Sequence, residues 1–383
     1  MIHFKEWSSE DVRVQLSWFD NGTEAIEAQA MVHVIRQELT FSRQLQAIHK
    51  AWLELSDCWG VSVTSVFKRY YLSDIANQIE EVKALERSLQ DSAYACSWVE
   101  QPPLDGTKIA LYTCLVAGMK TERGQDGCAV ASHNGYTHMW VGGRYADEGS
   151  PQEQTESVMK DYSRMLTSHG STLEHNSIRT WLFVDDIDRN YPAVVQGRNQ
   201  VFTQHQLTPD THFIASTGIG GKGSSCRSFM QMDAYAIAGI DLRQIRYLYA
   251  SSHMNRTSEY GVRFERGTCV DYGDRRHVFI SGTASINNKG EIMHVGDIRC
   301  QTERMLENVA ALLAEADCGW KDVTSAVIYL RDMADAGRVR QLLAPVLKNI
   351  PGILVWAPVC RPGWLIEMEC MATKTIHTAF PAY

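Results

Sequence analysis

The amino-acid sequence predicts an α+β protein made of three copies of one structural unit. A helical stretch followed by a β-rich run occurs three times along the 383 residues, and each copy continues into a second helical stretch and further strand-like sequence. The spacing from a glutamine in the helix to an aspartate after the strand is nearly constant, at 30, 32 and 31 positions in 44–74, 154–186 and 301–332. Repeats of roughly 120 residues are too long for a solenoid and fit duplicated compact domains.

The first helix of each copy is its clearest element. In the third copy Leu306, Val309 and Leu313 are spaced to share one helical face, and a β-rich run follows. In the second copy Gly170 ends an equivalent helix before a strand over 180–184. The second helical stretches are expected at 76–89, 191–205 and 334–348, and strand-like sequence follows each of them.

The unit boundaries are expected near residues 125 and 245. They divide the chain into units over 1–125, 126–245 and 246–383. The polar, turn-rich stretch KTERGQDG at 120–127 supports the first boundary. The opening strands of each unit are harder to recognise than its helices, so the boundaries depend mainly on the helices.

Composition narrows the class of partner. A chain with 44% hydrophobic and 21% charged residues is ordinary for a soluble globular protein. Its net charge of -8 argues against nucleic acid or an acidic membrane as a partner, because both require basic surfaces. An anionic substrate must therefore be bound by local arginines. The ten cysteines contain no CxxC pair, and the sequence shows neither a leader pattern nor a long apolar run, so a cytoplasmic protein with reduced thiols is expected.

A segment near the C-terminus places three reactive groups close together. Cys360, Arg361 and Glu367 lie within about eight residues, in a turn followed by a strand. Glu367 and Glu369 alternate with Ile366 and Met368, so the two acids are expected to share one strand face and to be partly desolvated. An edge strand with solvated glutamates and a core cysteine is the alternative interpretation of the same spacing.

Several separated motifs mark the third unit: ISGTAS at 280–285, GDI at 296–298, QT at 301–302, Asn308 and EME at 367–369. With these motifs the unit resembles the RidA/YjgF family, whose members form trimers of a chorismate-mutase-like α+β fold. The resemblance implies that one polypeptide with three such units forms an intramolecular pseudo-trimer.

A further set of motifs spans the second and third units: RTW at 179–181, ASTGIG at 215–220, YGVR at 260–263, FERGT at 264–268, ISGTASI at 280–286, and Arg361 followed by Glu367. With these motifs the two units together resemble the chorismatases, enzymes that remove pyruvate from chorismate. Within that family, Cys360 and Gly282 fit the branch that makes 3-hydroxybenzoate. The loop after Gly220, GKGSSCRSF, departs from the family pattern.

This resemblance implies a set of site residues. Chorismate carries two carboxylates, so more than one arginine is needed to make bidentate, charge-assisted pairs. The arginine candidates are Arg179, Arg263, Arg266 and Arg361. The other substrate-binding candidates are Tyr260, Thr217, Gly218 and Gly282, with the backbone N–H groups of a loop over 217–220 available to a carboxylate.

The catalytic candidates are Glu367 and Cys360. Cleavage of an enol ether begins with protonation of its terminal methylene, and a buried Glu367 with a raised pKa is a suitable acid. Cys360 is expected to act as a base or a steric guide on the ring, and as a base it requires a depressed thiol pKa. The segments taken as equivalent to that of Arg361, 100–102 and 216–218, contain no arginine, which predicts one cleft made by the third unit and closed by the second.

Two other functions stay open from the sequence: a RidA-like enamine/imine deaminase, and a non-catalytic metabolite-binding protein. No cofactor is expected, because the GxGxxG match at 218–223 is followed by strand-like rather than helical sequence. No metal site is expected either, because His133 and His138 lack a ligand-type spacing. A small dianionic substrate is the expected partner, and three units that satisfy one another's interfaces predict a monomer.

Overall fold

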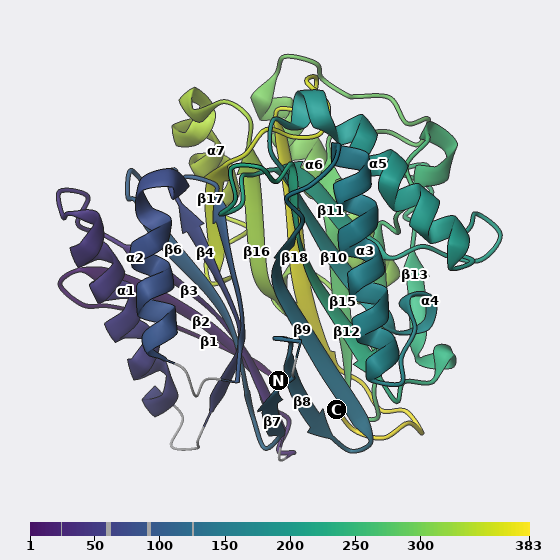
Figure 1. Cartoon of the computed structure of the whole chain (residues 1–383), viewed down its shortest axis with the longest axis horizontal. Helices are drawn as coiled ribbons and strands as arrows, with labels where there is room; N and C mark the ends of the chain where they lie inside the picture. Colours follow the sequence, from purple (N-terminus) through teal and green to yellow (C-terminus); the bar gives the residue numbers. More distant parts are fainter. Residues whose placement is uncertain (24, 59–62, 90–92, 125) are drawn as a thin grey trace.

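Three six-stranded sheets with one strand order form the protein in a computed structural model, which describes residues 1–383 except 24, 59–62, 90–92 and 125. Helices α1 and α2 lie on one outer side of the molecule and α3 and α5 on the other, with the strands between them (Figure 1). The prediction of an α+β protein with three tandem units arranged as an intramolecular pseudo-trimer is confirmed.

The first sheet has the order β1-β2-β3-β6-β4-β5. Strands β4 and β5 are parallel, since α2 returns the chain between them, and the other neighbours are antiparallel. Asp74 caps the N-terminus of α2 by accepting from the backbone of Asn77. The elements are β1 (Ile2–Ser8), β2 (Val12–Phe19), β3 (Ile26–Val34), α1 (Phe41–Glu54), β4 (Thr64–Leu72), α2 (Ile75–Ser88), β5 (Ala95–Glu100) and β6 (Ile109–Ala117).

The second sheet repeats this order as β7-β8-β9-β12-β10-β11. It begins at Lys120, ahead of the boundary expected near residue 125. Ser150 and Glu153 form a capping box at the start of α3. The elements are β7 (Lys120–Arg123), β8 (Ala129–His133), β9 (Tyr136–Tyr145), α3 (Pro151–Ser168), α4 (Leu173–Asn176), β10 (Ser177–Val184), α5 (Ile187–Gln204), β11 (Ala215–Gly220) and β12 (Met230–Ala238).

The third sheet has the equivalent order β13-β14-β15-β18-β16-β17. Its second helix, α7, is shorter than the expected stretch over 334–348. Short 3₁₀ helices at Leu55–Cys58, Leu242–Gln244, Thr257–Tyr260, Trp320–Asp322 and Met333–Asp335 lie in connections. The main elements are β13 (Ile245–Leu248), β14 (Gly267–Asp271), β15 (Arg275–Ala284), α6 (Ile298–Glu315), β16 (Val323–Leu330), α7 (Ala336–Leu343), β17 (Gly352–Trp356) and β18 (Ile366–Thr375).

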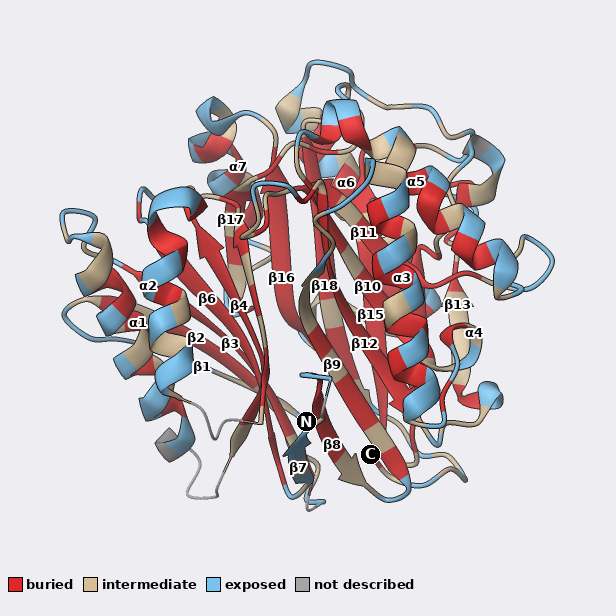
Figure 2. Ribbon diagram, in the orientation of Figure 1, coloured by how far each residue is buried: buried red, intermediate tan, exposed pale blue. Residues whose placement is uncertain are grey.

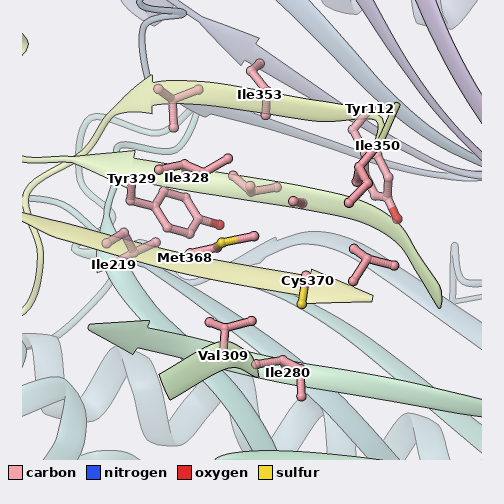
Figure 3. Packing of buried hydrophobic residues seen from close by; sticks show 14 of the residues in the cluster. Tyr112, Ile219, Ile280, Val309, Ile328, Tyr329, Ile350, Ile353, Met368 and Cys370 are labelled. Atoms are coloured by element: carbon pink, nitrogen blue, oxygen red, sulfur yellow. The ribbon is translucent and has the colours of Figure 1, made fainter. Parts of the chain in front are cut away.

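The core is continuous across the three units. The strands are largely buried, whereas the outer faces of the helices are exposed (Figure 2). One cluster of buried side chains joins Tyr112 of the first sheet, Ile219 of the second and Tyr329 of the third (Figure 3). Apolar burial of this kind is the main stabilising term in folding, and here it also fixes the sheets against one another. Among the described residues, no helix combines the length and the apolarity needed to cross a bilayer.

Candidate functional site

A pocket that opens to solvent lies between the second and third sheets, where the reactive C-terminal segment meets α5 and β11. The second unit contacts the third here through two isolated bridges, Ala215 with Glu265 and Ile219 with Val359. Its lining residues are Tyr191, Arg198, Ser216, Gly218, Val262, Phe264, Arg266, Gly282, Ala284, Ile286, Cys360, Arg361, Trp364 and Glu367.

Glu367 is the acid of this pocket. It is the second residue of β18, and its side chain is only 5% exposed. Burial, followed by the negative charge of Glu369, raises the pKa of Glu367 to about 8, against the opposing charges of Arg179 and Arg266. Glu367 is therefore a protonated, uncharged carboxylic acid at neutral pH and can donate a proton there.

Gly282 makes room for that carboxyl group. It lies at a bulge in β15, where the register with β18 shifts between Ile280 and Thr283. A Cβ atom at residue 282 would overlap Oε1 of Glu367 and lie 2.8 Å from its Cδ. The position of the acid thus depends on the absence of a side chain at residue 282.

Gly282→Ala is expected to reduce turnover much more than it reduces stability. The new methyl group must push the Glu367 carboxyl from its place, and a displacement of about 1 Å in a reacting group costs roughly 100-fold in rate. Steady-state kinetics and thermal unfolding of the variant test this expectation. Turnover close to that of the unmodified protein would show that the acid does not need this position.

Glu369 is held by a buried ion pair behind the pocket. Its Oε2 accepts from Nη2 of Arg179 at 2.8 Å and from Oγ1 of Thr217 at 2.5 Å, and its Oε1 accepts from Nε1 of Trp181 at 2.7 Å. As expected, the two acids of β18 share one face, and their surroundings differ. Glu369 is matched by a cation and two hydrogen bonds, whereas Glu367 is desolvated.

The sequence-predicted arginines separate into two groups. Arg266 and Arg361 line the pocket, and the Arg361 guanidinium lies over the Trp364 ring at 5.2 Å. Arg179 lies behind the pocket and is engaged with Glu369. Arg263 donates from Nη1 to the carbonyl of Asn199, on the side of α5, and is not among the lining residues.

Sequence reasoning missed Arg198 and Tyr191. Both belong to α5 and line the pocket, and Arg198 is only 1% exposed. Arg198 follows Val194 by four positions and precedes Val201 by three, so it lies on the apolar face of the helix. A charged residue at a core-facing helical position was the signal for it. No such signal marks Tyr191, because tyrosine is common on apolar helix faces.

Cys360 faces the same pocket but is a neutral thiol. Burial, followed by the charge of Glu367, raises the pKa of Cys360 to about 12, although Arg361 and a hydrogen bond with Tyr191 oppose this. Of the two roles expected for Cys360, that of a base requires a depressed pKa, and the thiol pKa is raised because desolvation outweighs the adjacent guanidinium. A basic thiolate does not form at neutral pH, which leaves Cys360 a steric or hydrogen-bonding role.

Residues 217–220 form strand β11 rather than the expected anion-binding loop. The Gly220 amide donates to the carbonyl of Pro358 at 2.9 Å, so it is not available to a carboxylate. The Thr217 hydroxyl donates a hydrogen bond to Glu369 and accepts one from the backbone amide of Gly282 at 2.9 Å. Gly218 lines the pocket, and a Cβ there would lie 2.7 Å from the Tyr191 ring. The Tyr260 side chain lies outside the described part of the structure.

Strand register identifies the counterparts of the two acids. Strands β18, β12 and β6 occupy the same place in their sheets, and each begins opposite the last residue of its antiparallel neighbour. Their second residues are therefore equivalent, and so are their fourth residues. The equivalent sets are Glu367, Gln231 and Ala110, and Glu369, Asp233 and Tyr112. Of the three second residues, only Glu367 is an acid, and it lies at the interface between the second and third units.

The same register corrects the alignment of the segment that contains Arg361. Trp356, Gly220 and Glu100 each pair with the last residue of the preceding strand and are equivalent. Arg361 lies five residues beyond Trp356, in the connection to β18. Residues 216–218 lie inside β11, before Gly220, and the segment 100–102 begins at Glu100, the counterpart of Trp356. The expected equivalence of both segments to that of Arg361 is therefore wrong.

The fold and the site define a class of protein. The chain matches the family model described as Endoribonuclease L-PSP over residues 268–374. It is 37% identical over 97 residues to the 3-aminoacrylate deaminase RutC of Acinetobacter baylyi, covering 25% of this chain and 77% of that protein. It is 34% identical over 100 residues to a RutC family protein of Pyrococcus abyssi, covering 25% and 78%. The chain therefore belongs to the RutC family.

A longer similarity is to chorismatase. The chain is 28% identical over 221 residues to the chorismatase of Streptomyces rapamycinicus, which covers 52% of this chain and 64% of that protein. A crystal structure of a chorismatase superposes with a TM-score of 0.61 at 20% identity, over 81% of this chain and 93% of the other, and so shares the fold. The predicted relationship to chorismatases within the RidA/YjgF superfamily is thus confirmed.

Proposed function

We propose that the protein is a chorismatase-type enzyme that converts chorismate to 3-hydroxybenzoate and pyruvate. One observation carries the proposal: a protonated Glu367 and three arginines, Arg198, Arg266 and Arg361, line one pocket. Because the acid is uncharged at neutral pH, the pocket is cationic and suits a dianion. Phe264 and Trp364 give it apolar walls for a ring.

Acid catalysis by Glu367 accounts for the first step of this reaction. Glu367 transfers its proton to the terminal methylene of the enolpyruvyl group. This leaves an oxocarbenium ion at the ether carbon, beside the Glu367 side chain, which is now a carboxylate. Water adds to that carbon and returns a proton to Glu367. The hemiketal formed in this way then collapses. The bond between the former ether carbon and the ether oxygen breaks, the hemiketal hydroxyl becomes the ketone of pyruvate, and its proton passes to the oxygen that stays on the ring, which leaves a ring diol. Loss of one water from the diol gives 3-hydroxybenzoate, so the overall reaction consumes no net water.

The test is incubation of the full chain with chorismate. Pyruvate release and an aromatic product that co-elutes with 3-hydroxybenzoate are expected, and Glu367→Gln serves as the inactive control. Absence of pyruvate above that control would reject the proposal. Ammonia release from a small imino acid would instead support the deaminase alternative, which the name of the Acinetobacter relative suggests.

Cys360→Ala is expected to change the product rather than stop the reaction. The thiol hydrogen-bonds with Tyr191 and lies beside Glu367, so its removal opens space next to the substrate ring. The diol is then held less firmly in position for loss of water. A larger fraction of the non-aromatic dihydroxy-cyclohexadiene product is expected at similar pyruvate output. Chromatography of both products measures the ratio, and an unchanged ratio would remove Cys360 from product control.

Arg198→Leu is expected to weaken substrate binding more than it lowers turnover. Loss of one buried partner of a charge pair costs about 2–5 kcal/mol in interfaces, so KM is expected to rise by at least roughly 30-fold. Arg299→Leu, on the exposed side of α6, is the matched control for loss of a positive charge. Equal KM values for the two variants would contradict a binding role for Arg198.

A further inference from the structure

We propose that Asp126, Cys128 and His169 form a binding site for a divalent transition metal of the Zn²⁺ class, in the second unit and apart from the chorismate pocket. Asp126 and Cys128 lie in the connection between β7 and β8, and His169 is the residue that ends α3. Their ligand atoms all lie within 4.8 Å of one another. No local pattern in the sequence marks this group, because His169 lies 41 positions from Cys128, and the expectation that the chain has no metal site is revised here.

The distances match those of a shared metal. Bond lengths of about 2.3 Å to sulfur and about 2.0–2.1 Å to nitrogen or oxygen, at tetrahedral angles, place sulfur and nitrogen about 3.6 Å apart and nitrogen and oxygen about 3.4 Å apart. Here Sγ of Cys128 lies 3.7 Å from Nε2 of His169, and Oδ2 of Asp126 lies 3.5 Å from the same nitrogen. Both distances are close to those expected around one shared ion, and the third pair of ligand atoms lies within 4.8 Å.

The surrounding backbone holds the ligands in this arrangement. Oδ1 of Asp126 accepts from the amide of Cys128 at 3.1 Å, which leaves Oδ2 directed toward His169. Nη2 of Arg144 donates to the Asp126 carbonyl at 3.0 Å, and the Gly124 amide donates to the Cys128 carbonyl at 2.9 Å. Hydrogen bonds that orient ligating groups are a regular part of metal sites.

The ligand types and their charges suit Zn²⁺. A thiolate, a carboxylate and a neutral imidazole neutralise a divalent cation, and the thiol proton is released to solvent as the metal–sulfur bond forms. Cys128 is buried and Asp126 is exposed, so metal can enter from the Asp126 side, where water completes the coordination. Such a site would tie the β7–β8 turn to the end of α3.

Titration of the full chain with Co²⁺ tests the site, because a bound thiolate gives Co²⁺ a charge-transfer absorption band. We expect one equivalent of Co²⁺ to bind with that band, and Zn²⁺ to displace it. Cys128→Ser is expected to abolish the band. His169→Gln, at a half-exposed helix end, is expected to weaken Co²⁺ binding at least tenfold while leaving the fold intact.

Cys226→Ser provides the matched control, since Cys226 is an exposed thiol outside this group. It is expected to leave both the band and the stoichiometry unchanged. Absence of a thiolate band in the unmodified protein would overturn the proposal. The same conclusion would follow if His169→Gln bound Co²⁺ as tightly as the unmodified chain, or if Cys226→Ser lost the band.

Discussion

Glu367→Gln is expected to slow pyruvate release from chorismate strongly while the protein stays folded. Glutamine has nearly the shape of the protonated acid, so it fits beside Gly282 but has no proton to give. General acid catalysis contributes typically 10²–10⁴-fold, and a loss of about that size is expected in kcat. Glu303→Gln, on the partly exposed face of α6, controls for the same chemical change elsewhere. Retained activity in Glu367→Gln would assign the proton donor to another group.

The pH dependence of the unmodified enzyme follows from the same residue. The acid form of Glu367 is active, and its pKa is raised to about 8, so kcat is expected to be constant near pH 6–7 and to fall as the pH rises through about 8. A pH–rate profile measures this fall. A fall centred near pH 4–5 would mean that the carboxyl is solvated and would contradict its burial.

Stability is expected to vary with pH in the same direction. The folded-state pKa of Glu367 lies above its value of 4.5 in the unfolded chain, so the folded protein holds the proton more tightly. The resulting stabilisation is complete below pH 4.5 and is lost as the pH rises to about 8. Glu367→Gln remains uncharged, so its stability relative to the unmodified protein is expected to increase over this range. Chemical unfolding of both proteins at several pH values measures the difference.

The sequence was sufficient for the repeating part of the fold and for the central acid. Helical periodicity located α1, α3 and α6, because their buried faces have the spacing of one helix side. Alternation in 366–369 placed both acids on one face of β18. The opening strands were not located for two reasons. Strands β7 and β13 have only four residues each, which is too short for a clear alternation, and β15 is buried along nearly its whole length, so alternation is lost.

The residues that sequence reasoning misplaced depend on contacts between units. Arg179 was expected to bind substrate, but it forms an ion pair with Glu369, which lies 190 positions away in the sequence. Arg198 enters the pocket from α5 across the interface with the third unit. Burial decides the pKa of the Cys360 thiol, and the presence of Arg361 next to it in the sequence gives no indication of that burial. Pairings over such separations leave no local pattern in the sequence.

Glu369→Gln is expected to lower stability and to move the pH–rate profile at the same time. Arg179 is 2% exposed and Glu369 5% exposed, and removal of one partner of a buried ion pair costs about 3–5 kcal/mol because the other charge is left uncompensated. Denaturant unfolding measures that loss. The double variant Arg179→Gln, Glu369→Gln removes both charges and is expected to recover much of it.

The effect of Glu369→Gln on catalysis separates the roles of the two acids. The charge of Glu369 raises the pKa of Glu367, whereas the charge of Arg179 lowers it. In Glu369→Gln the charge that raised this pKa is gone, and the charge of Arg179 that lowers it is no longer balanced. The pKa of Glu367 therefore falls, and the loss of kcat at high pH begins at a lower pH. A merely structural Glu369 would reduce stability and leave the profile in place. A shifted profile, with activity retained at pH 5–6, would show that Glu369 acts by keeping Glu367 protonated.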